Sequence, residues 1–300
     1  MSAAAEIKPR ARILNVTEAE YRADPCTVPS LSQSIAHTLI TRSPLHAWAE
    51  HPRLGNVVKR SEREPTKAQI QGTVMHALLL GKGSESVRVI DEKEYRTDVA
   101  KAKKKAAIAA GCTPILADEY EEAVAAVDVI RMRLAEHGCV FEGGQAEVAI
   151  EWEEDGPEGP VLCRGRLDYL IVEPKRAKIL DPKKITSADE NTCMRHADDY
   201  GHHIQRAAYV SAVEKLHPHL TGRVDFEFPF MEFEAPYAVV PRPCDGMSRW
   251  VGEQQWRRAY TVWQQCLNAN VWPSYPVVPL TVSPWTAKAE EELAEREQHS

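Results

Sequence analysis

Two acidic residues and a lysine occur in neighbouring segments whose residues alternate between polar and apolar. The first segment contains Arg164-Gly-Arg-Leu-Asp168, and the second contains Asp181-Pro-Lys183. Successive side chains of a β-strand point to opposite faces, so Arg164, Arg166 and Asp168 share the face opposite the apolar odd positions. Asp181 and Lys183 are two residues apart and share a face in the second strand.

A turn centred on Pro174-Lys175 would place Asp168 directly opposite Asp181 in a β-hairpin. Like charges in directly opposed positions destabilise a sheet. A divalent cation would make such a pair favourable, because hard oxygen ligands suit Mg²⁺. Lys183 could then orient a water molecule or stabilise charge on a phosphate, which outlines a phosphodiester-cleaving site. A solvated hairpin with ordinary surface charges fits the same spacing.

The composition is that of an ordinary globular protein. The 300 residues are 43% hydrophobic and 27% charged, with a net charge of -7. The negative charge argues against non-specific coating of nucleic acid but leaves room for a local basic channel. No apolar run approaches the roughly 18 residues of a membrane span, and the first ten residues lack a signal core. We therefore expect a cytoplasmic protein without a membrane partner.

The seven cysteines are scattered, and no two of them form a CxxC motif. This pattern argues against a structural zinc site or a disulfide framework. We expect free and mostly buried thiols.

Hydrophobic periodicity predicts helices followed by a compact run of strands that one long helix interrupts. The expected helices include 67–80, 99–110, 113–138, 189–216 and 247–268, and the expected strands include 87–90, 146–152, 161–172, 223–231 and 237–240. Residues 272–285 are expected to wrap the body as irregular chain. The pattern favours one α/β domain over 29–286, after an N-terminal extension (1–28) and before an acidic tail (287–300).

Five motifs in this order resemble the RecE (exonuclease VIII) group of the PD-(D/E)XK nuclease superfamily. They are Gly72–His76, Glu147 with its strand, Cys163–Asp168, Asp181–Lys183 and Gln205–Tyr209. Segments 32–48 and 272–275 also look like features of this group. The resemblance implies a restriction-endonuclease-like core, in which a central mixed β-sheet is flanked by helices.

On this resemblance, Asp168 and Asp181 ligate Mg²⁺ or Mn²⁺, and Lys183 positions the attacking water. His76 would complete the metal site, together with the backbone carbonyl of Pro182. Glu147 would lie nearby as a catalytic residue. A lone helix histidine and a strand glutamate are, however, also common as packed or solvated residues.

The remaining candidates would contact DNA or brace the site. Gln205 and Tyr209 are four residues apart and therefore lie on one helix face. Arg164 and Arg166 are expected as phosphate contacts, although pairing with Glu153 or Glu154 would equally explain them. Plain packing of Tyr209 is an equivalent alternative.

The chain departs from the resembled pattern between the second acid and the lysine. The residue there is Pro182, where the group usually has an apolar residue, and Lys184 follows in place of a threonine. Proline removes a donor from a strand but keeps its carbonyl. Lys184 adds a second cation that would bind phosphate or perturb Lys183. A weakened or inactive nuclease therefore remains an alternative.

The resemblance implies a metal-dependent exonuclease that degrades linear double-stranded DNA from its ends, with 5′ to 3′ polarity, in phage-type recombination. It also implies a ring-like homo-oligomer around DNA and a single-strand annealing recombinase as partner. The alternatives are a RecB-like nuclease of other polarity and a catalytically silent DNA-end-binding protein on the same fold.

Overall fold

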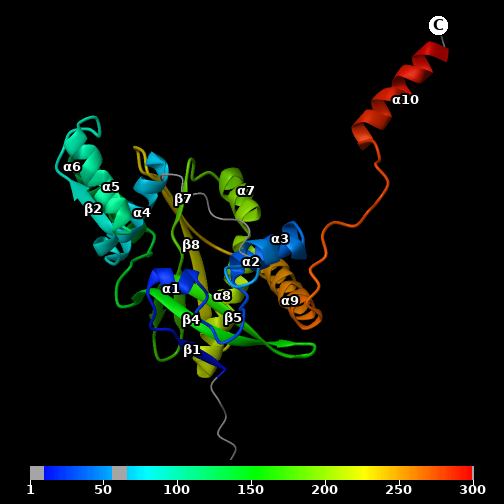
Figure 1. Ribbon diagram of the computed structural model, residues 1–300, viewed down its shortest axis with the longest axis horizontal. Coiled ribbons are helices and arrows are strands. Elements are labelled where there is room, and N and C mark those ends of the chain that lie inside the picture. Colours follow the sequence, from blue (N-terminus) through cyan, green and yellow to red (C-terminus); the bar gives the residue numbers. More distant parts are fainter. Residues whose placement is uncertain (1–9, 56–65, 299–300) are drawn as a thin grey trace, which may run out of the picture.

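A computed structural model describes residues 10–55 and 66–298. Residues 56–65 of the loop expected at 53–66 lie outside the described residues. The described chain forms a central sheet with helices on both of its sides, followed by a C-terminal arm that projects from the body (Figure 1). None of the helices in the described ranges combines the length and hydropathy needed to cross a membrane.

The sheet is mixed, as the sequence predicted. Its strands follow the order β1-β4-β5-β6-β8-β7, and β9 pairs with β8. The pairs β1–β4, β4–β5, β5–β6 and β8–β9 are antiparallel, while β6 and β7 both run parallel to β8. The bounds are β1 Ala11–Ile13, β4 Gln145–Gly156, β5 Gly159–Val172, β6 Ala177–Leu180, β7 Lys183–Ile185, β8 Val224–Glu232 and β9 Val239–Pro243. The expected fold class is therefore confirmed.

Helices from distant parts of the sequence pack on one side of the sheet. The larger hydrophobic core joins them to β4, β5, β6 and β8, with Trp152, Leu167 and Trp263 at its centre. These helices are α2 Gln33–Thr41, α3 Pro44–Glu50, α7 Glu190–Tyr200, α8 His202–Leu216 and α9 Gly246–Ala269. The short helix α1 Glu18–Arg22 follows β1, so residues 10–28 contribute a sheet strand and a helix.

A second, smaller core holds a separate group of elements against β5, β6 and β8. Helices α4 Lys67–Leu80 and α6 Ala117–Glu136 provide most of its side chains. Helix α5 Asp98–Ala109 and the parallel strands β2 Val87–Ile90 and β3 Thr113–Leu116 complete the group. The part of the chain that the structure describes thus has two cores, and β5 contributes to both.

Two helix predictions were wrong in their extent. The helix expected over 113–138 begins only at Ala117, because Thr113–Leu116 pairs with β2 as a strand. The helix expected over 189–216 is two helices, α7 and α8, which meet at Gly201 in a left-handed conformation with φ of 66°. Apolar periodicity continues across this break, so the periodicity alone could not reveal it.

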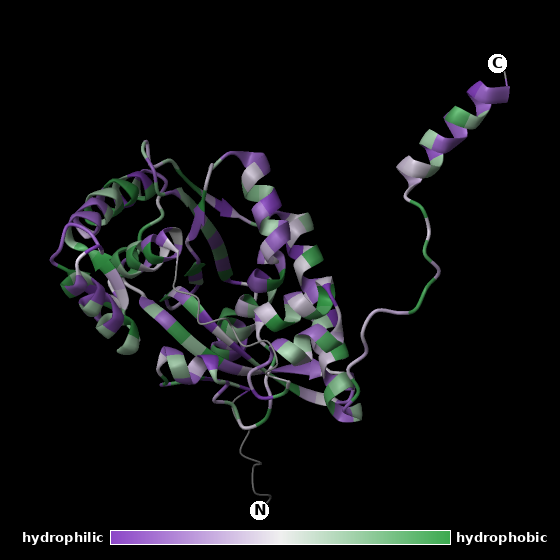
Figure 2. Ribbon diagram, turned by 45° about the horizontal axis from the view of Figure 1, so that its top comes forward, coloured by the Kyte–Doolittle hydropathy of each residue, from purple (hydrophilic) through white to green (hydrophobic). Residues whose placement is uncertain are grey.

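The C-terminal region also differs from its prediction. Trp272 packs against Trp263 at a ring-centroid distance of 5.2 Å, but the chain after Tyr275 leaves the body instead of wrapping it. Val277 and Leu280 are fully exposed in this connector, whose apolar residues are green in Figure 2. The expected acidic tail is largely the helix α10 Pro284–Gln298.

The break at Gly201 predicts a specific sensitivity to side chains. A Cβ atom at Gly201 would lie 2.4 Å from the His37 ring, whereas at Gly222, which has φ of 73°, it would meet nothing within 4 Å. Gly222→Ala should lower the free energy of unfolding by about 1–2 kcal/mol through backbone strain alone. Gly201→Ala should cost clearly more, as measured by urea denaturation. Equal losses would show that the helix break tolerates the added methyl group.

Candidate active site

Asp168 and Asp181 come together at the ends of two adjacent strands. The β5–β6 ladder pairs Tyr169 with Leu180 and Val172 with Ala177, which is the predicted hairpin register. Asp181 follows directly after β6, so the predicted opposition of the two acids is confirmed. Asp181 is 1% exposed, and the Asp168 side chain is 27% exposed.

Asp181 is held by three groups from three elements. The Lys183 ammonium contacts Oδ1, and the Gln205 amide on α8 donates a hydrogen bond to Oδ2. The backbone N–H of Asp181 donates to the Glu227 carbonyl at 3.1 Å. Lys183 thus shares the face of Asp181 as expected, and Gln205 orients this carboxylate.

His76, on helix α4, contacts Asp168. Its Nε2 lies 3.4 Å from Asp168 Oδ2, and its side chain is about one-third exposed. Helix α4 positions His76 because Thr66 and Gln69 cap its first turn and Gly81 ends it in a left-handed conformation.

The pKa values of the two acids are shifted in opposite directions. Burial and the neighbouring Asp168 raise the pKa of Asp181 to about 7, against the opposing effect of Lys183. Burial alone would also raise the pKa of Asp168, but His76 and Lys183 lower it overall. Burial opposes the charged form of His76, yet its bond to Asp168 raises the pKa of that imidazole. The pair therefore resists full ionisation, as expected for two acids that share one buried space.

These groups fit a magnesium-type ion. Among the described residues, no set of three or more His, Cys, Asp or Glu side chains could hold a metal ion by itself. Mg²⁺, however, is commonly bound through one or two carboxylates, with water and substrate phosphate completing its shell. A cation between Asp168 and Asp181 would also relieve their mutual repulsion. The donor set therefore suits an oxygen-coordinated ion shared with substrate better than a closed structural site.

Glu147 and Asp168 lie between the Ala146–Tyr169 and Val148–Leu167 pairs of the β4–β5 ladder, and Glu147 adopts a strained backbone. Its φ is 56°, uncommon for a residue other than glycine. Its carboxylate forms an ion pair with the Arg166 guanidinium, with 2.6 Å between Glu147 Oε1 and Arg166 Nη2. On one side of it Val148 and Leu167 pack in the larger core, and on the other Ala146 and Tyr169 pack in the smaller one. The two strands therefore change sides together at Glu147 and Asp168, which places Asp168 at the boundary between the cores.

A cleft adjoins Asp168 on the α4 side. Its volume is about 390 Å³. Arg22, Lys82 and Arg166 line it together with the carboxylates of Glu18, Glu147 and Asp168, and His76 lies beside them. Arg22 pairs with Glu18, and Arg166 pairs with Glu147. Sequence reasoning missed Arg22 and its neighbour Glu18, because nothing in the N-terminal segment indicated that α1 packs beside the site.

The other predicted residues occupy varied positions. A Cβ at Gly165 would lie 2.6 Å from the Tyr209 ring, so Tyr209 is buried directly against β5 and braces it. The Lys184 ammonium lies over the Phe233 ring, at 5.2 Å from its centroid. Pro182 falls between β6 and β7, and it therefore costs the sheet no ladder hydrogen bond.

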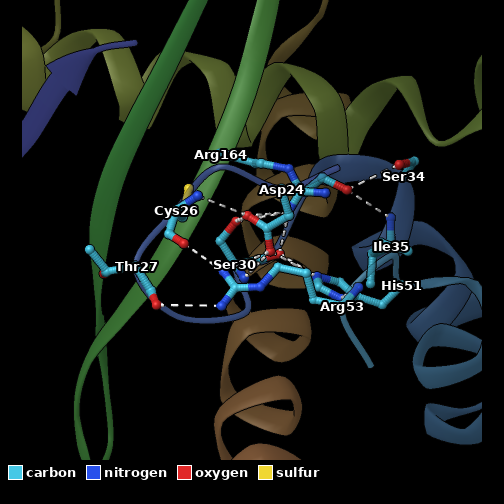
Figure 3. Close-up of polar contacts among 10 residues, drawn as sticks. Asp24, Cys26, Thr27, Ser30, Ser34, Ile35, His51, Arg53 and Arg164 are labelled. Carbon is cyan, nitrogen blue, oxygen red and sulfur yellow. Dashed lines mark hydrogen bonds and ion pairs between the residues drawn. The ribbon is translucent and has the colours of Figure 1, made fainter. Parts of the chain in front are cut away.

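Arg164 is buried in a polar network with Asp24, Ser30 and His51 (Figure 3). It donates to the Ser30 carbonyl at 2.7 Å and pairs with Asp24 at 3.3 Å. Asp24 also accepts from the Ser30 backbone N–H at 2.9 Å and lies 3.3 Å from His51 Nε2. This network fastens residues 24–32 to β5 and so fixes the segment that carries α1. Sequence reasoning did not identify Asp24, Ser30 or His51.

The comparisons with known proteins agree with this geometry. The family model described as the PD-(D/E)XK nuclease superfamily matches residues 30–296. The chain belongs to this superfamily. Its members typically use divalent metal ions, and membership supports a nuclease activity.

A solved structure shares the fold of this nuclease-superfamily chain. It is described as a "Putative exonuclease" from Eubacterium rectale, with 14% identity, a TM-score of 0.58, and coverage of 90% of this chain and 97% of that chain. A second structure, SSO0001, has 9% identity and a TM-score of 0.33, and covers 88% of this chain and 100% of that chain. Only the first is similar enough to support the fold. No curated protein matched the chain.

The buried Asp24 network predicts an acid-sensitive contribution to the stability of this nuclease fold. Burial would raise the pKa of Asp24, but His51, Arg164 and Ser30 lower it to about 2. Its stabilising effect is therefore complete above the ordinary carboxyl pKa and is lost as the pH falls through about 2. Asp24→Asn should lower the free energy of unfolding at pH 7 by about 3–5 kcal/mol, because it leaves the Arg164 charge buried without its partner.

Urea denaturation between pH 7 and pH 2 checks this expectation, with Asp155→Asn as the control. Asp155 pairs with Arg10 at the surface and is 78% exposed, so its loss should cost at most about 1 kcal/mol. The difference between wild type and Asp24→Asn should narrow below pH 4. A difference that stays constant down to pH 2 would contradict the assigned charge state.

The strained backbone of Glu147 gives a second expectation. Glu147→Gly and Glu147→Ala both remove the partner of Arg166, but only glycine relieves the left-handed φ. The glycine variant should be about 1–2 kcal/mol more stable than the alanine variant. At Glu153, on the same strand without a positive φ, alanine should be the more stable substitution. Chemical denaturation of the four variants checks the order, and the same order at both positions would refute strain at Glu147.

Proposed function

We propose that the protein is an Mg²⁺-dependent exodeoxyribonuclease that degrades linear double-stranded DNA from its ends, with 5′ to 3′ polarity. The observation that carries the proposal is the convergence of Asp168, Asp181 and Lys183 at adjacent strand ends, with Gln205 fixing Asp181. Superfamily membership and the fold shared with a protein described as an exonuclease support it.

Each residue has a distinct part in this proposal. Asp168 and Asp181 would hold the metal ion with the Pro182 carbonyl, and His76 would hold Asp168 in place. Bound there, the ion would stabilise negative charge that develops on the phosphate. Lys183 stands on the same carboxylate, where its ammonium can donate a hydrogen bond to the attacking water or the phosphate. Gln205 keeps Asp181 from turning away from this position.

The α4-side cleft would bind the substrate backbone. Arg22, Lys82 and Arg166 supply cations that match phosphate groups on one side of Asp168. Glu147 holds the Arg166 guanidinium and limits its movement.

The phage-type recombination role, a ring-like homo-oligomer and a single-strand annealing partner belong to the same proposal. They rest on the motif order alone. Sedimentation of the full chain with and without duplex DNA would test the oligomer directly.

The decisive experiment is digestion of end-labelled linear duplex DNA with Mg²⁺, beside a closed circular control. Asp168→Asn and Asp181→Asn should each lower the rate of linear digestion by about a hundredfold or more, since several kcal/mol of transition-state stabilisation depend on the metal. Asp225→Asn removes an exposed carboxylate on β8 and should leave the rate unchanged. Earlier release of a 5′ label than of a 3′ label would support the polarity.

Two other outcomes would change the proposal. Cutting of the circular DNA would indicate an endonuclease. DNA binding without Mg²⁺-dependent cutting of either substrate would favour a silent end-binding protein.

A further inference from the structure

A second pocket adjoins the site at Lys183 and Gln205, whereas the α4 cleft adjoins it at Asp168. It has a volume of about 500 Å³, within the range of roughly 300–1,000 Å³ typical of small-molecule sites. Lys183 and Gln205 line its inner end, and Tyr200, His196 and His202 line a wall. The pocket is therefore directly next to the proposed catalytic groups.

The wall is built from aromatic rings that contact one another. The Tyr200 and His196 ring centroids are 4.5 Å apart, and the His202 ring stacks on Phe228 with centroids 5.0 Å apart and an interplanar angle of 22°. His196 Nδ1 and His202 Nε2 share a hydrogen bond of 2.9 Å. Phe228 lies on β8, so the rigid sheet supports the rings from behind.

The helix break at Gly201 produces this arrangement. Tyr200 is the last residue of α7 and His202 is the first residue of α8, so the left-handed turn between them lets both side chains reach the pocket. The missing side chain of Gly201 also lets the His37 ring approach from α2. An uninterrupted helix would separate the two rings by about 200° around its axis.

The pocket is almost free of positive charge. Among its described lining residues only Lys183 is a cation, and it is paired with Asp181. Burial lowers the pKa of His37 and of His196, and that of His202 to about 2, so these rings are neutral near pH 7. Glu50 adds a carboxylate, which bonds Thr38 and Arg42. The pocket therefore offers little positive charge to neutralise a phosphate, but it offers aromatic surfaces on which a flat uncharged ring can stack.

We propose that this pocket holds one unpaired nucleobase of the DNA strand beside the scissile phosphate, stacked on the exposed ring of Tyr200. The inference rests on the proposed function, because it assigns the substrate chemistry of the same site. Tyr200 is 62% exposed and so is free to receive a base. The side chains of Gln33 and Ser34, which also line the pocket, offer hydrogen bonds to base edges. The α4 cleft would hold phosphates and the Tyr200 pocket a base, with Asp168, Asp181 and Lys183 between them.

The test measures binding of a short duplex with three unpaired nucleotides at one end. The full chain carries Asp168→Asn so that it cannot degrade the probe, and a 2-aminopurine in the unpaired end reports stacking through its fluorescence. Tyr200→Ala should weaken binding by about fivefold or more and abolish the fluorescence change, because base–aromatic stacking contributes strongly to binding of single strands. Tyr200→Phe should bind like the parent.

Matched controls separate the pocket from general effects. Trp250→Ala removes another aromatic ring that is 58% exposed but does not line the pocket, and it should leave binding unchanged. An abasic site at one nucleotide of the unpaired end should remove the difference between Tyr200→Ala and its parent. The inference would be overturned if an abasic site at every position removed this difference equally. It would also be overturned if Tyr200→Ala bound the intact probe as tightly as its parent.

Probes with a 5′-phosphate and a 5′-hydroxyl should show the same effect of Tyr200→Ala. An effect seen only with the phosphate would mean that the pocket holds a terminal phosphate, which also overturns the base assignment. Failure here leaves the nuclease proposal intact if the wild type digests linear DNA. The converse outcome is a wild type that digests no DNA while Tyr200→Ala still weakens binding at one position of the unpaired end. The base pocket would then belong to a silent end-binding protein.

Discussion

Two carboxyl groups must share a buried space where β5 and β6 end, and several elements of the fold supply the groups that compensate their charge. Asp168 and Asp181 cannot both ionise there without compensation, as the raised pKa of Asp181 shows. The compensating groups come from separate parts of the chain: Lys183 from β7, Gln205 from α8 and His76 from α4. A fold that failed to assemble all three elements would leave the acids unpaired, so assembly of the sheet and its two helix layers is coupled to formation of the site.

The boundary between the two hydrophobic cores explains why this acidic pair can still be reached from solvent. Strands β4 and β5 change sides together at Glu147 and Asp168, so neither core closes over Asp168. The left-handed backbone of Glu147 accompanies this change and is stabilised by the ion pair with Arg166. Strained residues of this kind concentrate where a fold must meet a functional requirement. Here the strain opens a path to the acids between two otherwise well-packed layers.

The sequence predicted the parts of this arrangement that depend on local spacing. Strand alternation and the turn at Pro174-Lys175 gave the register that opposes Asp168 and Asp181, because a hairpin register follows from its turn. The sequence did not predict the helix break at Gly201, since apolar periodicity continues across it. It also did not predict that Arg164 is buried in an ion pair with Asp24. Both depend on contacts between segments far apart in the chain. Arg164 and Arg166 look alike in sequence, yet one anchors the N-terminal segment and the other lines the cleft.

The two pockets beside the acids differ in a way that net charge does not reveal. Paired cations and carboxylates line the α4 side, and neutral aromatic rings line the α7–α8 side. A single strand of DNA presents the same division, because its phosphates are charged and its bases are flat and neutral. A base of a duplex would have to leave its partner before it could occupy the proposed Tyr200 pocket alone. A site divided in this way would therefore favour DNA ends, where base pairs open most readily, over the interior of an intact duplex.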